Sequence, residues 1–300
     1  MKRNSIMNKD NFLLIDGNYL LFSSFYASYN PDRLENIMRS PQGLTTNGVH
    51  VFLMTLSKLI AYFKPKYLFI AFDAYGETRR HKIFKDYKAG RTKAPEIIFE
   101  QFSLIKEILT KLNIKWFEQV GDEADDLIAT LAQNQDCNNL IFSKDKDLLQ
   151  LVNLNTSVIK VVKENFKVSY ELEDINNFET IHGIKPSQVV DYKGLAGDSS
   201  DNLRGINGIG HKGAIKLIQT FDSIENMYQN IDQIKGKTKE KLLDEKDQAF
   251  LCKALAKLNL NVDMNKNISD YLLNLNLEDG LDAMRFYGLN KCANLFEELK

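Results

Sequence analysis

The sequence is poor in the residues that build disulfide frameworks and soft-metal sites. It has only three cysteines, Cys137, Cys252 and Cys292, which are scattered and have no metal-ligand spacing. Its four histidines do not cluster either. These shortages exclude a disulfide-stapled scaffold and argue against histidine-based metal catalysis. We expect free thiols in a reducing cytosol.

The sequence also lacks a long apolar run and a large net charge of either sign. No stretch approaches the length of a membrane span, and the formal net charge is −1. The first 22 residues begin basic and turn apolar, as signal peptides do, but Asp16 interrupts the apolar run. We therefore expect a soluble, cytoplasmic chain. Any binding of nucleic acid must depend on where its charges lie.

Hydrophobic patterns divide the chain into two parts. Apolar runs at 12–16, 67–73 and 139–145 predict buried strands, with amphipathic helical patterns between them. This alternation predicts an α/β domain at 1–178, in which helices flank a mostly parallel central sheet. Residues 157–172 predict a later hairpin or edge pair. Only helical patterns follow residue 179, so 179–300 are predicted to form an all-α domain.

Acidic residues mark the ends of the predicted strands. Asp16, Asp73 and Asp145 each end one, and open parallel sheets bind ligands at that edge. More acids follow in "GDEADD", "SKDKD" and "GDSSD". Any single one could instead cap a helix or a turn. The full candidate set is Asp16, Asp73, Glu123, Asp125, Asp126, Asp145, Asp147, Asp198 and Asp201.

Carboxylates that converge in such numbers cannot all stay ionised without cations, because each raises the pKa of its neighbours. Hard divalent ions prefer oxygen ligands, which makes Mg²⁺ or Mn²⁺ the natural choice. The set exceeds the needs of one ion. It therefore predicts a site for two Mg²⁺ (or Mn²⁺) that carries out phosphoryl transfer.

A basic segment, residues 74–98, follows Asp73. Between Arg79 and Lys93 it has seven basic residues and one acidic residue. The spacing predicts a helix whose cations contact phosphates and whose rings stack on unpaired bases. A solvated surface helix is the alternative. The candidate DNA contacts are Arg80, Lys82 and Lys85, and the candidate catalytic groups are Tyr87, Lys88 and Arg91.

The stretch "INGIGHKGA" at 206–214 predicts a helix–hairpin–helix within residues 195–220. Glycines permit a sharp turn and close approach of the backbone. The helix that follows offers free N–H groups to a phosphate, which grips the DNA backbone without reading bases. The candidate contacts are Gly205, Gly208, Gly210 and Lys212.

These motifs, in this order, resemble the 5′–3′ exonuclease and flap endonuclease family, including the nuclease domain of bacterial DNA polymerase I. The residues that carry the resemblance are "LLIDGNYLLFSSFYA", "AFDAYGETRRHKIFKDYKAGR", "GDEADDLIATLA", "SKDKDLLQLV" and "GLAGDSSDNLRGINGIGHKGA". No polymerase sequence follows, so we expect a free-standing version. Lys144 stands where a small or acidic residue is usual.

The resemblance implies a PIN-like nuclease core in which the basic segment forms a helical arch. It implies that all nine acids serve the metals, that Tyr87 stacks near the 5′ end and that Lys88 contacts the scissile phosphate. Arg80 and Arg91 would lie in the arch, and the glycine-rich turn would bind duplex DNA, with a K⁺ ion. We expect a monomer that works beside DNA polymerase and ligase.

The predicted activity is structure-selective hydrolysis of DNA at 5′ flaps, nicks and gaps, including RNA-primed DNA, in replication and repair. Three alternatives arise from the residues, and the basic segment leaves little room for one of them, a phosphotransferase that acts on small molecules. A ribonuclease of similar acidic α/β fold would prefer RNA flaps, and a non-catalytic DNA-structure-binding protein would bind flaps without cutting them.

Overall fold

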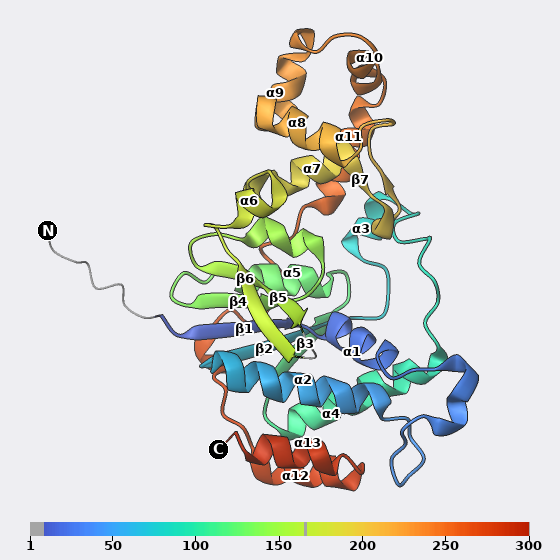
Figure 1. The fold of residues 1–300 in the computed structure, drawn as a ribbon, viewed down its shortest axis with the longest axis vertical. Coiled ribbons are helices and arrows are strands. Elements are labelled where there is room, and N and C mark those ends of the chain that lie inside the picture. Colours follow the sequence, from blue (N-terminus) through green and yellow to red (C-terminus); the bar gives the residue numbers. More distant parts are fainter. Residues whose placement is uncertain (1–8, 165–166, 300) are drawn as a thin grey trace, which may run out of the picture.

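A twisted sheet of mostly parallel strands forms the centre of the molecule (Figure 1). The computed structural model describes residues 9–164 and 167–299, and there the main sheet has the order β3-β2-β1-β4-β5-β6. Neighbouring strands pair in parallel except β5 and β6, which form an antiparallel hairpin. The strands are β1 (Asn11–Asp16), β2 (Tyr67–Asp73), β3 (Lys115–Gln119), β4 (Asn138–Phe142), β5 (Thr156–Glu164) and β6 (Lys167–Glu173).

The predicted strands and the predicted hairpin are confirmed, whereas β3 is an additional strand. β3 lies at the edge of the sheet and pairs only with β2. Its residues are exposed or half-buried, so it lacks the apolar run of the inner strands. The basic start of the chain, residues 1–8, lies outside the described ranges.

Side chains of β1 alternate between two cores, one on each face of the sheet. Leu13 and Ile15 pack with α1 (Gly17–Tyr26), α2 (Asn47–Phe63) and α4 (Phe99–Lys111). Phe12 and Leu14 pack on the opposite face with α5 (Ala124–Leu131). Because both faces are covered, the centres of β1 and β2 are apolar throughout, as in parallel sheets generally. In the described ranges no helix is both long and apolar enough to cross a bilayer.

Short helices build the second part of the chain, which lies above the sheet in Figure 1. They are α6 (Phe178–His182), α7 (Val189–Ala196), α8 (His211–Phe221), α9 (Ile224–Gln229), α10 (Lys237–Asp244) and α11 (Lys246–Ala256). A small ribbon of β7 (Gly197–Asp198) and β8 (Leu203–Arg204) joins α7 to the hairpin before α8. The chain then returns to the sheet, where α12 (Leu277–Phe286) and α13 (Asn290–Glu297) pack in the core beside α4 and α2. The boundary at 178/179 stays a prediction.

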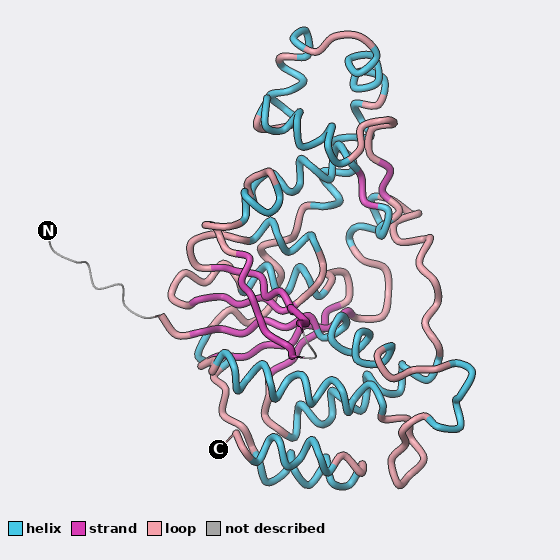
Figure 2. Tube along the Cα trace, viewed as in Figure 1, coloured by secondary structure: helices cyan, strands magenta, loops and turns pink. Residues whose placement is uncertain are grey.

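The basic segment is mostly irregular chain, as Figure 2 shows, so the prediction of a continuous helix there is wrong. Its one α-helix, α3, covers Arg79–Ile83, and successive turns follow it. Lys88 adopts a left-handed conformation, with a φ of 58°, which interrupts a right-handed helix. The Tyr87 side chain points inward and is buried, and its burial anchors the irregular chain to the rest of the protein.

Candidate functional site

The parallel strands deliver their terminal carboxylates to one edge of the sheet. Asp16 ends β1 and Asp73 ends the neighbouring β2. The Asp16 carboxylate accepts hydrogen bonds from the Tyr19 N–H and the Ser143 hydroxyl, both at 2.8 Å. Burial raises the pKa of Asp16 to about 7, and the nearby charges of Asp73 and Asp145 add to the rise. A metal ion bound here would relieve this repulsion.

Five of the predicted ligands form two groups of carboxylates. Asp125, Asp145 and Asp147 form one, Asp147, Asp198 and Asp201 form the other, and the ligand oxygens within each group lie within 4.8 Å of one another. Asp147 belongs to both. Burial raises the pKa of Asp147 to about 7. Two sets of hard oxygen donors joined by a shared carboxylate fit a pair of divalent cations.

A cavity of about 240 Å³ opens beside the first of these groups, and Asp125 and Asp145 line it. Asp16, Asp73 and Glu123 line it without belonging to either group of carboxylates. Lys88 and Arg91 also line it, so the basic segment contributes to the same cavity. Cations therefore lie over the acidic cavity, which suits a site that must bind a polyanion.

Ion pairs tie the basic segment to the acids. The Lys88 ammonium lies 2.9 Å from a Glu123 carboxylate oxygen, and the Arg91 guanidinium lies 2.9 Å from an oxygen of Asp201. The Lys88 N–H also donates to the Asp201 carbonyl. These contacts hold both cations at the mouth of the cavity, where a phosphate would meet them.

Tyr87 does not lie where the resemblance implies. Its side chain is only 3% exposed, and its hydroxyl contacts Asp201 at 3.0 Å and Glu123 at 3.2 Å. The ring is therefore covered in this conformation and cannot stack on a nucleobase. The carboxylates that the hydroxyl bridges hold the ring inward.

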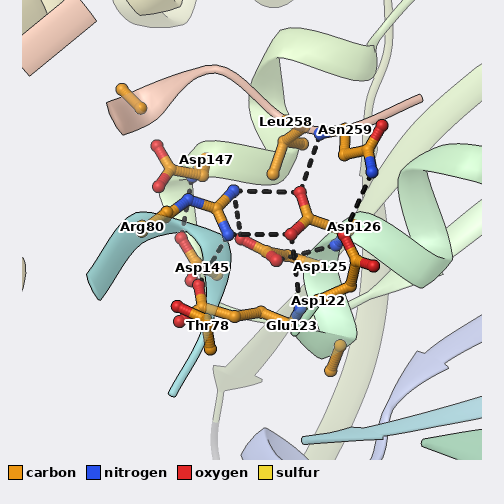
Figure 3. Close-up of polar contacts among 12 residues, drawn as sticks. Thr78, Arg80, Asp122, Glu123, Asp125, Asp126, Asp145, Asp147, Leu258 and Asn259 are labelled. Carbon is orange, nitrogen blue, oxygen red and sulfur yellow. Dashed lines mark hydrogen bonds and ion pairs between the residues drawn. The ribbon is translucent and has the colours of Figure 1, made fainter. Parts of the chain in front are cut away.

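Arg80 and Asp126 also differ from their predicted roles (Figure 3). Arg80 is 2% exposed, and its guanidinium forms a bidentate pair with Asp126 at 2.9 and 3.0 Å. It also donates to Glu123 at 2.7 Å and to the Leu255 carbonyl at 2.9 Å. The Asn259 N–H donates to Asp126 at 2.7 Å. Arg80 is thus an internal counter-ion rather than an open DNA contact, and Asp126 faces it instead of a metal group.

The predicted hairpin lies between α7 and α8, with Gly208 and Gly210 exposed before α8 and Lys212 exposed in the first turn of that helix. Gly208 has a φ of 80°, which favours glycine. Gly205 is different, because it is buried and a Cβ there would lie 2.3 Å from the Gly197 nitrogen. Gly205 therefore serves backbone packing within the hairpin. Lys82 and Lys85 remain exposed on the basic segment.

Lys193 is the site residue that sequence patterns did not reveal. It is buried on α7, where its ammonium contacts Asp147 and lies 2.6 Å from an Asp198 oxygen. The net pKa of Asp198 is below its usual range. Burial alone would raise this pKa, but the charge and the hydrogen bond of Lys193 lower it by more. The available signal was a lysine five positions before an aspartate in a helix rich in apolar residues.

Carboxylates grouped as divalent cations require, with Lys88 and Arg91 beside them, have the composition of a metal-dependent nuclease site. Comparison with known sequences agrees with this class. Residues 11–179 match the family model described as 5′-3′ exonuclease, N-terminal resolvase-like domain. Residues 184–278 match the model described as 5′-3′ exonuclease, C-terminal SAM fold. The chain belongs to the 5′–3′ exonuclease family, which confirms the resemblance.

Similar proteins occur both within longer chains and at this length. A 5′-3′ exonuclease of Mycoplasmopsis pulmonis is 37% identical over 96% of this chain and 94% of its own length. DNA polymerase I of Lactococcus lactis is 41% identical over 89% of this chain, which spans 30% of that polymerase. The solved T5 D15 flap endonuclease, in a complex with DNA and metal ions, has the same fold at 20% identity, with a TM-score of 0.64 over 96% of this chain and 98% of its own.

Proposed function

We propose that this protein is a structure-selective 5′–3′ exonuclease and 5′-flap endonuclease that hydrolyses DNA with two divalent metal ions. The observation that carries the proposal is the pair of carboxylate groups joined by Asp147, because Lys88 lines the same cavity as Asp125 and Asp145 and Arg91 pairs with Asp201. The products would be a 5′-phosphate and a 3′-hydroxyl, since water adds to the phosphorus and the 3′ oxygen leaves.

The two groups of carboxylates would hold the ions, one at Asp125, Asp145 and Asp147 and the other at Asp147, Asp198 and Asp201. Bound Mg²⁺ or Mn²⁺ supplies Lewis acidity and a water of lowered pKa. Lys88 and Arg91 would leave their carboxylate partners to bind the phosphate oxygens and stabilise the charge that develops on them. Asp16 and Asp73 would complete the acidic wall of the cavity.

The hairpin before α8 would grip duplex DNA away from the cut. Gly208 and Gly210 allow the backbone to approach, and Lys212 adds a cation. The resemblance adds a K⁺ ion at this turn. The fold shared with the T5 D15 flap endonuclease, which was solved in a complex with DNA and metal ions, supports a DNA substrate and a metal site for this chain. The substrates would be 5′ flaps, nicks, gaps and RNA-primed DNA, processed in replication and repair beside polymerase and ligase by a monomer.

The test is cleavage of a 5′-flap DNA labelled at either end, in Mg²⁺ or in EDTA. We expect cuts near the flap junction that require Mg²⁺ and disappear in Asp145→Asn. Asp136→Asn is the matched control, because it makes the same substitution at an exposed aspartate. Asp136 precedes β4 and Asp145 follows it, so the two lie at opposite ends of the same strand. Tight flap binding without cleavage in Mg²⁺ or Mn²⁺ would reject catalysis, and preferential cutting of RNA flaps would reject the substrate class.

A further inference from the structure

A second cavity, of about 300 Å³, lies next to the catalytic one, between the chain that follows β4 and the hairpin of β5 and β6. We call it the β5 cavity. Tyr19 and Asp145 line both cavities, so the two are contiguous. Whatever enters the β5 cavity therefore lies beside the carboxylates. Of the other residues that line it, Ser143 donates to Asp16, and the two-metal site as described uses none of the rest.

The β5 cavity differs from the catalytic cavity in chemistry. Its wall is apolar, and Phe142, Tyr19 and Val161 of β5 are among the residues that line it. Phe142 is buried, and its ring centroid lies 5.7 Å from that of Tyr19. Its rim has three exposed lysines, Lys144, Lys146 and Lys160. An apolar, aromatic-lined hollow with cations at its edge has the two features that a nucleotide requires, a surface for the base and partners for the phosphate.

The lysines at the rim are available to a ligand. In the described part of the chain, no carboxylate lies within ion-pair distance of Lys144 or Lys146, and Lys160 has only a long 3.9 Å contact with the exposed Glu171. The acid deeper in the cavity, Glu173, is paired with His182 at 2.9 Å. Asp145 is the remaining acid of the lining, and a bound metal would neutralise it. The rim is thus cationic toward a strand that arrives from the catalytic cavity.

We propose that the β5 cavity is a nucleotide subsite that receives one base of the cut strand next to the scissile phosphodiester. The base packs on the half-buried Tyr19 ring, which the buried Phe142 supports from within, and Lys144 contacts a backbone phosphate. The proposal rests on the proposed function, which supplies the strand. A base held here would fix which phosphodiester lies over the metals.

The test places a single abasic nucleotide at successive positions on either side of the cleavage site of a 5′-flap DNA. With the wild type, we expect one adjacent position to lose about tenfold in kcat/KM, the scale of one base–aromatic contact. Val161→Trp fills the cavity without altering a carboxylate, so it should show that loss with intact DNA. When the DNA has the abasic nucleotide at the sensitive position, the kcat/KM of Val161→Trp should be the same as its kcat/KM with intact DNA.

Charge is tested separately, with a variant that has no reason to unfold. Lys144→Gln should weaken flap binding and lower the slope of log Kd against log salt by about 0.7 to 0.9, the value of one phosphate contact. Lys163→Gln is the matched control, because Lys163 is exposed on the same hairpin as Lys160 but does not line the cavity. Equal effects of Lys144→Gln and Lys163→Gln would overturn the role of Lys144.

Two further outcomes would overturn the subsite itself. In the first, the kcat/KM of the wild type falls equally wherever the abasic nucleotide is placed. In the second, the fall in kcat/KM caused by Val161→Trp multiplies with the fall caused by the abasic nucleotide. The same DNA set is titrated by fluorescence anisotropy with Ca²⁺ in place of Mg²⁺. If the wild type binds flaps but never cuts them, the proposed function fails, and the binding data still decide whether the cavity holds a base.

Discussion

Removing the positive charge of Arg80 should destabilise the protein far more than removing that of its neighbour Arg79. Arg80→Met leaves Glu123 and Asp126 buried without their shared guanidinium. Breaking a buried pair from one side costs about 3–5 kcal/mol. With a urea m-value of about 3 kcal/mol per molar, the unfolding midpoint should fall by about 1–2 M.

Arg79→Met is the matched control for this measurement. The Arg79 guanidinium also approaches Asp126, but at 3.5 Å, and its side chain is 43% exposed. Solvent screens such a pair, so the expected loss in the free energy of unfolding is at most about 1 kcal/mol. Arg80→Lys keeps the charge but loses the bidentate geometry, and we expect an intermediate loss.

The partner variant Asp126→Asn separates a structural acid from a metal ligand. If Asp126 serves Arg80, the variant should lose about 3 kcal/mol of stability while the half-saturating Mg²⁺ concentration for cleavage stays the same. The reasoning would be refuted by a rise of roughly tenfold or more in that concentration at unchanged stability, since a metal site that loses a supporting group changes its affinity on that scale.

Three further outcomes are expected. Lys193→Met should lower the half-saturating Mg²⁺ by about tenfold, equivalent to about 1.4 kcal/mol, because the ammonium no longer competes for Asp147; calorimetric titration that shows weaker binding would contradict this. In EDTA, the stability contributed by Asp16 and Asp147 should fall as pH rises from about 4 to about 7, because burial raises both folded-state pKa values to about 7 from 3.8; melting temperatures that rise across that window would contradict the shifts. Gly205→Ala should cost about 2–3 kcal/mol by urea unfolding, since its Cβ would meet backbone, whereas Gly210→Ala meets open space and should cost far less; equal losses would refute the packing role.

Sequence patterns predict the inner sheet well because its chemistry is local. A buried parallel strand needs an apolar run, and a ligand site at its carboxyl end needs a polar residue where the run stops, as Asp16 and Asp73 provide. β3 escapes the same reasoning because an edge strand is covered on fewer sides. Its stability comes from pairing with β2, which the residues of β3 alone do not reveal.

Sequence patterns predict the structure of the basic segment wrongly, for a different reason. A run of cations has the same spacing whether it faces solvent, DNA or buried acids. Arg80 turns inward because Glu123 and Asp126, forty and more positions away, begin α5 at the point where α3 passes. Only the fold brings them together, so helix propensity and charge spacing could predict neither the buried pair nor the irregular path that follows it.

The two buried cations explain how so acidic a site folds before metal arrives. Arg80 compensates Glu123 and Asp126 on one side, and Lys193 compensates Asp147 and Asp198 on the other. In the group with Asp125 and Asp145, Asp125 lies 3.6 Å from the Arg80 guanidinium and Asp147 contacts Lys193, but Asp145 has no ion-pair partner in the described ranges. Every acid of the other group has one, Lys193 for Asp147 and Asp198 and Arg91 for Asp201, so the first group keeps more uncompensated charge. A first divalent ion should therefore bind there. The group with Asp198 and Asp201 accepts a second ion only when Lys193 gives up its carboxylates, which makes this lysine the internal competitor of the second metal.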